Sequence, residues 1–128
     1  MKAGEMMLER FFHLADMLDL YGMLLTEKQR RCLELHLFDD FSLAEIGEAV
    51  GVSRQAAYDM VHRSEQALEG YEEKLGLLRR LVEEHEELAA IAKALGDLRT
   101  EDNSAAVDAI LQRIEKLLGT QREVQHDI

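Results

Sequence analysis

The feature of the sequence that most constrains its fold is the stretch from Asp39 to Arg63, which carries two helix starts separated by a glycine turn. Ser42 with Glu45 three residues later forms a capping box, and Ser53 is a second N-cap candidate two residues after Gly51. Glycine adopts the left-handed conformation that ends a helix at low cost, so Gly51 is expected to end the first helix. The spacing therefore predicts two short helices joined by a tight turn, which is a helix-turn-helix pattern.

The two faces of this motif are expected to differ. The side chains expected to be buried between its helices are Ile46, Val50, Val52, Ala57 and Met60, and the small residues that permit a close crossing are Gly47, Ala56 and Ala57. A recognition helix places its outer side chains on bases or phosphates. The candidates for that role are Ser53, Arg54, Gln55, Tyr58, Asp59, His62 and Arg63. A compact helical corner that touches no nucleic acid fits the same pattern.

A cluster of positive charge precedes the motif, at Lys28, Arg30 and Arg31. Thr26 with Gln29 forms a capping box that opens a helix from about Glu27 to Phe38, so these cations lie in its first turns. Basic residues near a helix N-terminus oppose the helix macrodipole, so helix stability does not explain them. They are candidates for phosphate contacts beside the recognition helix; the alternative is a solvated surface balanced by neighbouring glutamates.

The overall charge argues against tight, autonomous binding to duplex DNA. The chain has 15 Lys and Arg against 26 Asp and Glu, a formal net charge of −11. Neutralisation of phosphates supplies most non-specific DNA affinity, and proteins that hold a duplex concentrate positive charge. The sequence thus favours a binding mode that uses a small basic patch on an acidic protein.

Composition and apolar periodicity predict an all-α fold. The chain has no proline, and its apolar residues recur at helical spacing. Residues 5–21 form a broad apolar stripe, typical of a packing helix, and the recognition helix continues in heptads until a break predicted between Lys74 and Gly76. We therefore expect a helix-turn-helix domain over residues 1–75 and a helical arm over residues 76–128.

The arm is predicted to be an antiparallel pair of helices, at Leu77 to Leu95 and Ser104 to Leu118. Gly119 is expected to end the second helix, with the last nine residues frayed. The apolar stripes of the two arm helices need a surface that covers them, either the helix-turn-helix domain or another chain. We predict that a second copy of the chain covers them, so that the protein is a homodimer. The residues proposed for that contact are Leu88, Ile91, Leu95, Val107, Ile110, Leu111, Ile114, Leu117 and Leu118.

Several classes of function are not indicated. The chain shows no glycine-rich phosphate loop, no pair of cysteines and no HExxH spacing among its histidines, so we expect no enzyme, metal site or cofactor. The apolar runs are too short for membrane insertion, and the N-terminus does not resemble a secretory signal, so a soluble cytoplasmic protein is expected. Cys32 is predicted to be a buried, reduced thiol, and His36 to be partly buried.

The motifs of residues 24–78 resemble those of the YlxM family, small bacterial proteins with a helix-turn-helix like region 4 of sigma factors. The resemblance lies in the TEKQR helix start, the DDFSLAEIGE centre, the GVSRQAAYD recognition start and the YEEKLGLL exit. It implies a sigma region 4-like head followed by the helical arm. It also implies an association with the signal recognition particle, through the particle RNA or its GTPase. A transcriptional regulator that binds specific DNA is the alternative, although Tyr58 and Asp59 stand where sigma factors tend to carry basic or amide residues.

Overall fold

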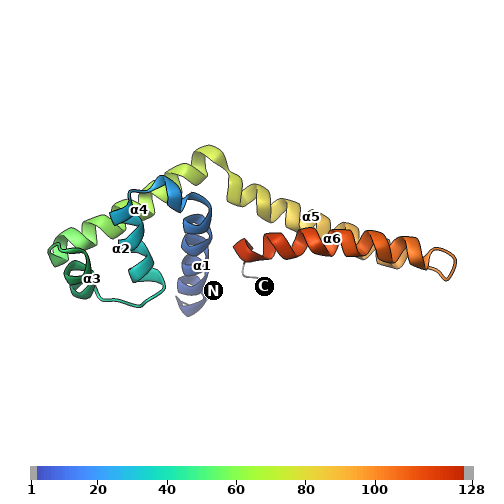
Figure 1. The fold of residues 1–128 in the computed structure, drawn as a ribbon, viewed down its shortest axis with the longest axis horizontal. Helices are drawn as coiled ribbons and strands as arrows, with labels where there is room; N and C mark the ends of the chain where they lie inside the picture. Colours follow the sequence, from blue (N-terminus) through green and yellow to red (C-terminus); the bar gives the residue numbers. More distant parts are fainter. Residues whose placement is uncertain (1–2, 126–128) are drawn as a thin grey trace. The chain divides into compact units, whose positions relative to one another are not determined.

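The computed structural model describes residues 3–125, and the side chains of residues 7–119. This part of the chain is entirely helical, as predicted (Figure 1). The elements are α1 (Ala3–Tyr21), a 3-10 turn η1 (Gly22–Leu24), α2 (Glu27–Leu37), α3 (Leu43–Val50), α4 (Arg54–Leu75), α5 (Leu77–Asp97) and α6 (Ser104–Gln125). The chain divides into two compact units, Met1–Gly76 and Leu77–Ile128, which we call the head and the hairpin.

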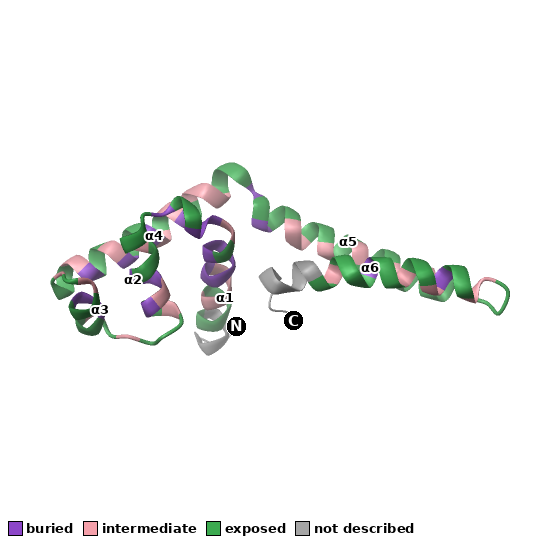
Figure 2. Cartoon of the chain, viewed as in Figure 1, coloured by how far each residue is buried: buried purple, intermediate pink, exposed green. Residues whose placement is uncertain are grey.

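The core of the head forms where α4 packs against α1, α2 and α3. Ala57, Val61, Ser64 and Leu68 are buried along one side of α4 (Figure 2). The first residues of the heptad pattern predicted for this helix therefore face the core, whereas Leu75, the last residue of α4, is exposed. The largest fully buried side chains of the head are Tyr21, Met17, Leu33, Ile46, Leu68 and Cys32.

The helix starts and turns of the head agree with the sequence predictions. Both capping boxes are present, at Thr26 with Gln29 and at Ser42 with Glu45. Gly51 ends α3 with φ 77°, and Gly76 ends α4 with φ 62°, both in the left-handed region. The predicted break in the long helix is thus confirmed at Gly76. Cys32 is fully buried, as predicted, but His36 is exposed, so its predicted partial burial is wrong.

The hairpin consists of α5 and α6, which pack against each other along their lengths (Figure 1). Its connection is held by Asn103, whose side chain accepts from the Thr100 backbone N–H at 2.6 Å and donates to the Leu98 carbonyl at 3.0 Å. Arg99 adds a bidentate ion pair with Asp108, at 2.8 and 2.9 Å.

The predicted C-terminal boundary of the second hairpin helix is wrong. Gly119 does not end this helix, because α6 continues through it to Gln125. Residues 120–125, predicted to be frayed, are helical, and residues 126–128 lie outside the described residues. Over the described helices, none combines the length and the hydropathy that crossing a membrane requires.

Candidate nucleic-acid interface

The turn between α3 and α4 fixes where the recognition helix begins. The Val52 backbone N–H donates to the Gly47 carbonyl at 2.8 Å, which closes the C-terminal end of α3. A Cβ at the buried Gly47 would lie 2.6 Å from the Val52 carbonyl oxygen, so the close approach requires glycine. One residue further on, the Ser53 hydroxyl accepts from the Ala56 N–H at 3.0 Å and caps α4. These contacts hold the first turn of α4 against the end of α3.

The first half of α4 presents its predicted contact residues to solvent. All seven, from Ser53 and Arg54 to His62 and Arg63, are exposed. Two pairs organise this surface: Gln55 Nε2 donates to Asp59 Oδ1 at 3.3 Å, and the rings of Tyr58 and His62 lie nearly parallel, at 7°, with centroids 5.9 Å apart. The centre of the face is therefore polar and aromatic, and the arginines stand at its ends.

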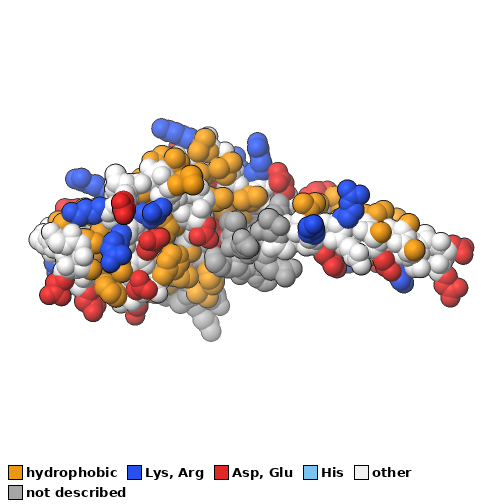
Figure 3. Space-filling model, in the orientation of Figure 1, with side chains coloured by type: hydrophobic (Ala, Val, Ile, Leu, Met, Phe, Trp, Pro, Cys, Tyr) orange, Lys and Arg blue, Asp and Glu red, His pale blue; other side chains and the backbone are white. Residues whose placement is uncertain are grey.

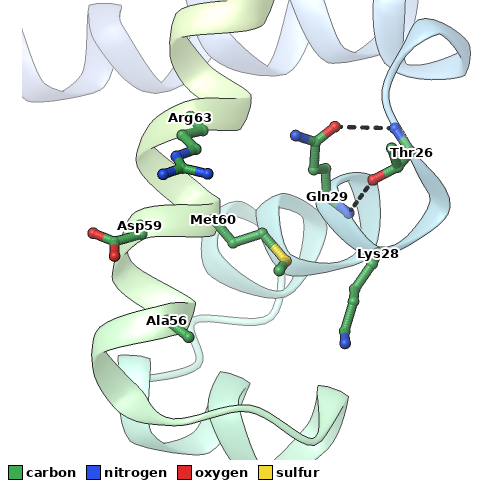
Figure 4. A pocket seen from close by; sticks show the side chains of 7 residues that line it. All are labelled: Thr26, Lys28, Gln29, Ala56, Asp59, Met60 and Arg63. Carbon is green, nitrogen blue, oxygen red and sulfur yellow. Dashed lines mark hydrogen bonds between the residues drawn. The ribbon is translucent and has the colours of Figure 1, made fainter.

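A groove of about 370 Å³ separates the start of α2 from α4 (Figure 4). Met60 and Gln29 lie between the two helices, Lys28 stands on the α2 side, and Asp59 and Arg63 stand on the α4 side. The two cations therefore border the groove from different helices. Because Asp59 also borders it, the positive charge along this groove is interrupted.

A second groove, of about 330 Å³, lies between α2 and the end of α3. It is lined by Glu27, Lys28, Arg31, Ala49 and Val50, so Lys28 borders both grooves. The structure separates the members of the predicted basic cluster, because Arg30 lines neither groove. The stem of Arg30 instead lies over Gly22, where an added Cβ would be 3.5 Å from Arg30 Cδ.

The other flank of α4 carries the aromatic pair. Tyr58 and His62 line a pocket of about 180 Å³ together with His36, Leu43, Val61 and Glu65. The structure thus divides the predicted contact set in two: Lys28, Arg31 and Arg63 border the grooves beside α2, while Tyr58 and His62 border a pocket toward the start of α3. Neither His36 nor Glu65 was predicted for this surface. The place of His36 depends on how α2 packs across α4, whereas Glu65, three residues after His62 on the same helix, could have been found from helical spacing.

Acidic side chains lie among the cations over the head, where red and blue groups alternate in Figure 3. One of them, Glu45, is part of the capping box of α3. The backbone N–H of Ser42 donates to its carboxylate at 2.8 Å, and this contact is the largest cause of the lowered pKa of Glu45. Glu45 is therefore held ionised at the start of α3, where it adds negative charge near the basic residues of the head.

Comparison with known proteins places these features in a family. Residues 8–110 match the family UPF0122, described as "Putative helix-turn-helix protein, YlxM / p13 like". A UPF0122 protein of Halalkalibacterium halodurans is 41% identical over 109 residues, which cover 85% of this chain and all of that protein. The UPF0122 protein YlxM of Bacillus subtilis is 39% identical over 112 residues, covering 88% of this chain and 99% of that one. No solved structure matches the chain significantly.

Proposed function

Since the chain belongs to the UPF0122 family of YlxM- and p13-like helix-turn-helix proteins, we propose that it is a non-enzymatic adaptor that binds nucleic acid through α4 and the start of α2. The observation that carries this proposal is the exposure of every predicted contact residue of α4 beside Lys28 and Arg31 of α2. A helix held at its N-terminus by a rigid turn, with its outer side free, is what insertion into a groove or loop requires.

We propose structured RNA as the ligand class. Sequence-specific RNA binding often stacks unpaired bases on aromatic side chains, and the exposed rings of Tyr58 and His62 provide such a surface. Phosphates on either side of a splayed base could reach Lys28, Arg31, Arg54 or Arg63. An acidic protein with so few cations is better suited to a short, local contact than to tracking a duplex.

The physiological ligand proposed from the family resemblance is the RNA of the signal recognition particle, with the particle's GTPase as an associated partner. The protein would then work in the cytoplasm, as a homodimer joined through its hairpin. A DNA-binding transcriptional regulator is the second candidate, since Gln and Asp are residue types that read adenine and cytosine edges in the major groove, and Gln55 and Asp59 are both exposed.

The test is a titration by fluorescence anisotropy against three labelled probes: the particle RNA, random duplex DNA of equal length and the purified GTPase. Each titration is repeated over a salt series. We expect the RNA to bind most tightly, with an affinity that falls as salt rises. Duplex DNA bound more tightly than the RNA would favour the transcriptional regulator, and binding to the GTPase alone would make this face a protein interface.

The residues are tested by replacing Arg31 and Arg54 together with Glu. We expect RNA affinity to fall at least about tenfold, and the log–log salt slope to fall by about 1.4, since each single-strand phosphate contact contributes about 0.7. The matched control is Lys74→Glu with Lys93→Glu, which changes the net charge equally at exposed positions outside the predicted contact set. Equal losses of RNA affinity in the two variants would mean that only net charge matters. No loss of affinity in either variant would mean that the assigned face does not bind the RNA.

A further inference from the structure

The hairpin buries only part of its apolar surface. Val107 and Ile114 of α6 are 5% and 8% exposed, whereas five large apolar side chains of the hairpin remain exposed, with Leu77 at 40%. Ile91 is 45%, Ile110 46%, Leu117 55% and Leu98 67% exposed. Two helices alone cannot enclose stripes this wide, because each helix can cover only one side of the other.

Three of these exposed side chains, Ile91, Ile110 and Leu117, lie on one face of the hairpin. Successive residues are rotated by about 100° around a helix axis. By this rotation Ile91 is displaced from the inner line of α5, and Ile110 and Leu117 are displaced from the inner line of α6, in the same rotational sense along each helix. Leu98 lies in the turn after α5. Because the two helices run in opposite directions, the same sense brings both sets to the same face. Hydrophobic side chains are visible along the hairpin in Figure 3.

Charged side chains also lie on this face: Glu84 is seven residues before Ile91 on the same line of α5, and Arg80 is seven residues before Glu87 on the same edge. At one level, the two edges carry opposite charges. Glu87 lies beyond Ile91 on the outer edge of α5, and Arg113 lies beyond Ile110 on the outer edge of α6; both are exposed. Glu87 and Arg113 are nearly the same number of residues away from the middle of the α5–α6 connection. With a rise of about 1.5 Å per residue, the two charges lie within about 3 Å of the same height along the hairpin. One edge is thus negative at the level where the other is positive.

We propose that this face binds the same face of a second copy, with the two hairpins parallel, to form a four-helix bundle. A two-fold axis along the hairpin places each α5 over the partner's α6, which is the neighbour arrangement of such bundles. It brings Glu87 opposite the partner's Arg113, and the symmetry makes this ion pair twice. The arrangement specifies the geometry of the homodimer proposed above, and both heads leave the bundle from the end at Gly76.

The apolar part of the interface is tested with Ile110→Asp combined with Leu117→Asp in the full chain. Both residues are half exposed, so these changes leave the buried contacts of Val107 and Ile114 in place. Light scattering is expected to report a dimer for the wild type and a folded monomer for this variant, with helix content retained by circular dichroism. The control, Ala89→Asp with Gln112→Asp, adds the same charge on exposed positions of the opposite face and should remain a dimer. A wild type that is monomeric at every concentration would overturn the proposal.

The parallel register is tested by charge reversal. Glu87→Arg alone, or Arg113→Glu alone, sets like charges against each other at both symmetric positions, so the dissociation constant of the dimer should rise at least about tenfold. The double exchange should restore it to within about threefold of the wild type. Reversals without effect, or a double variant no better than the singles, would refute this register even if the chain is a dimer. Because mass is measured without nucleic acid, these outcomes are independent of RNA binding.

Discussion

Gly47 is the position where one added carbon should distort the helix-turn-helix most. It is buried in α3, and a Cβ built there lies 2.6 Å from the Val52 carbonyl oxygen and 3.2 Å from the carbonyl carbon and oxygen of Ser53. These neighbours are backbone atoms, so no side chain can rotate away to make room. Gly47→Ala must therefore push the turn away from α3, and with it the start of α4.

The expected cost is a balance of two effects. In a helix interior, alanine is favoured over glycine by up to about 1 kcal/mol, which alone would make the variant more stable. Overpacking a rigid site costs about 1–3 kcal/mol. Displacing the turn also strains the 2.8 Å hydrogen bond from the Val52 N–H to the Gly47 carbonyl, typically worth about 1 kcal/mol. We expect a net loss of about 1–3 kcal/mol from the free energy of unfolding.

Gly70→Ala is the matched reference for this substitution. Gly70 is also inside a helix of the head, but a Cβ there would meet nothing within 4 Å. Helix propensity then acts alone, so Gly70→Ala should raise the free energy of unfolding by up to about 1 kcal/mol. The same chemical change is thus expected to have opposite signs at the two glycines.

Tyrosine fluorescence can follow the head alone during thermal unfolding. All three tyrosines, Tyr21, Tyr58 and Tyr71, belong to the head, and the chain has no tryptophan. For a unit of this size, a change of 1 kcal/mol shifts the melting temperature by about 4–8 °C. The melting temperature should fall for Gly47→Ala and rise for Gly70→Ala. If both rise equally, α3 does not approach the turn closely enough for a Cβ at position 47 to clash with it.

Two further changes probe single contacts. Ser53→Ala removes the acceptor for the Ala56 N–H and should cost about 1 kcal/mol, read from the same tyrosine melt; an unchanged melt would mean that the cap is not formed in solution. Hydrogen bonding from Arg99 lowers the pKa of Asp108, so the stability that this ion pair adds is present above the ordinary carboxyl range and is lost as pH falls through the lowered value. Melts of the full chain by far-ultraviolet ellipticity, which reports the helices of both units, should therefore show less dependence on acid pH in Asp108→Asn than in the wild type, and equal pH profiles would contradict this assignment.

The helix starts and the turn could be predicted from the sequence because their determinants are local. Each N-cap lies within three residues of the amide it satisfies, so Thr26, Ser42 and Ser53 define their helix starts by themselves. The exposure of the predicted contact residues of α4 follows from helical periodicity, because Ala57 and Val61 on the opposite side of the helix face the core. Local chemistry and helical spacing were thus enough to predict the helix starts and the exposed side of α4. Burial was predicted less well, because Val50, Val52 and Met60 are only half-buried, whereas Ile46 and Ala57 are buried as expected.

The grouping of the contact residues depended on packing that no local pattern encodes. Lys28 and Arg31 lie one turn apart and share a groove, while Arg30 between them turns toward Gly22. Likewise, His36 joins Tyr58 and His62 only because the end of α2 crosses near the middle of α4. Crossing angles and interhelical register decide such groupings, and they are set by the whole core.

Glycine alone does not identify a helix end, as Gly51 and Gly119 show. Both follow an apolar helical run, but α3 ends at Gly51 whereas α6 passes through Gly119. A glycine inside a helix costs only about 1 kcal/mol, which a continuing helix can recover from its remaining hydrogen bonds. What distinguishes Gly51 is the sequence after it, where Val52 bonds back to Gly47 and Ser53 starts the next helix. Thr120 with Glu123 after Gly119 also has the spacing of a capping box, but α6 runs through both residues. Cap spacing after a glycine therefore does not end a helix by itself; at Gly51 the hydrogen bond from Val52 back to Gly47 accompanies the end of α3.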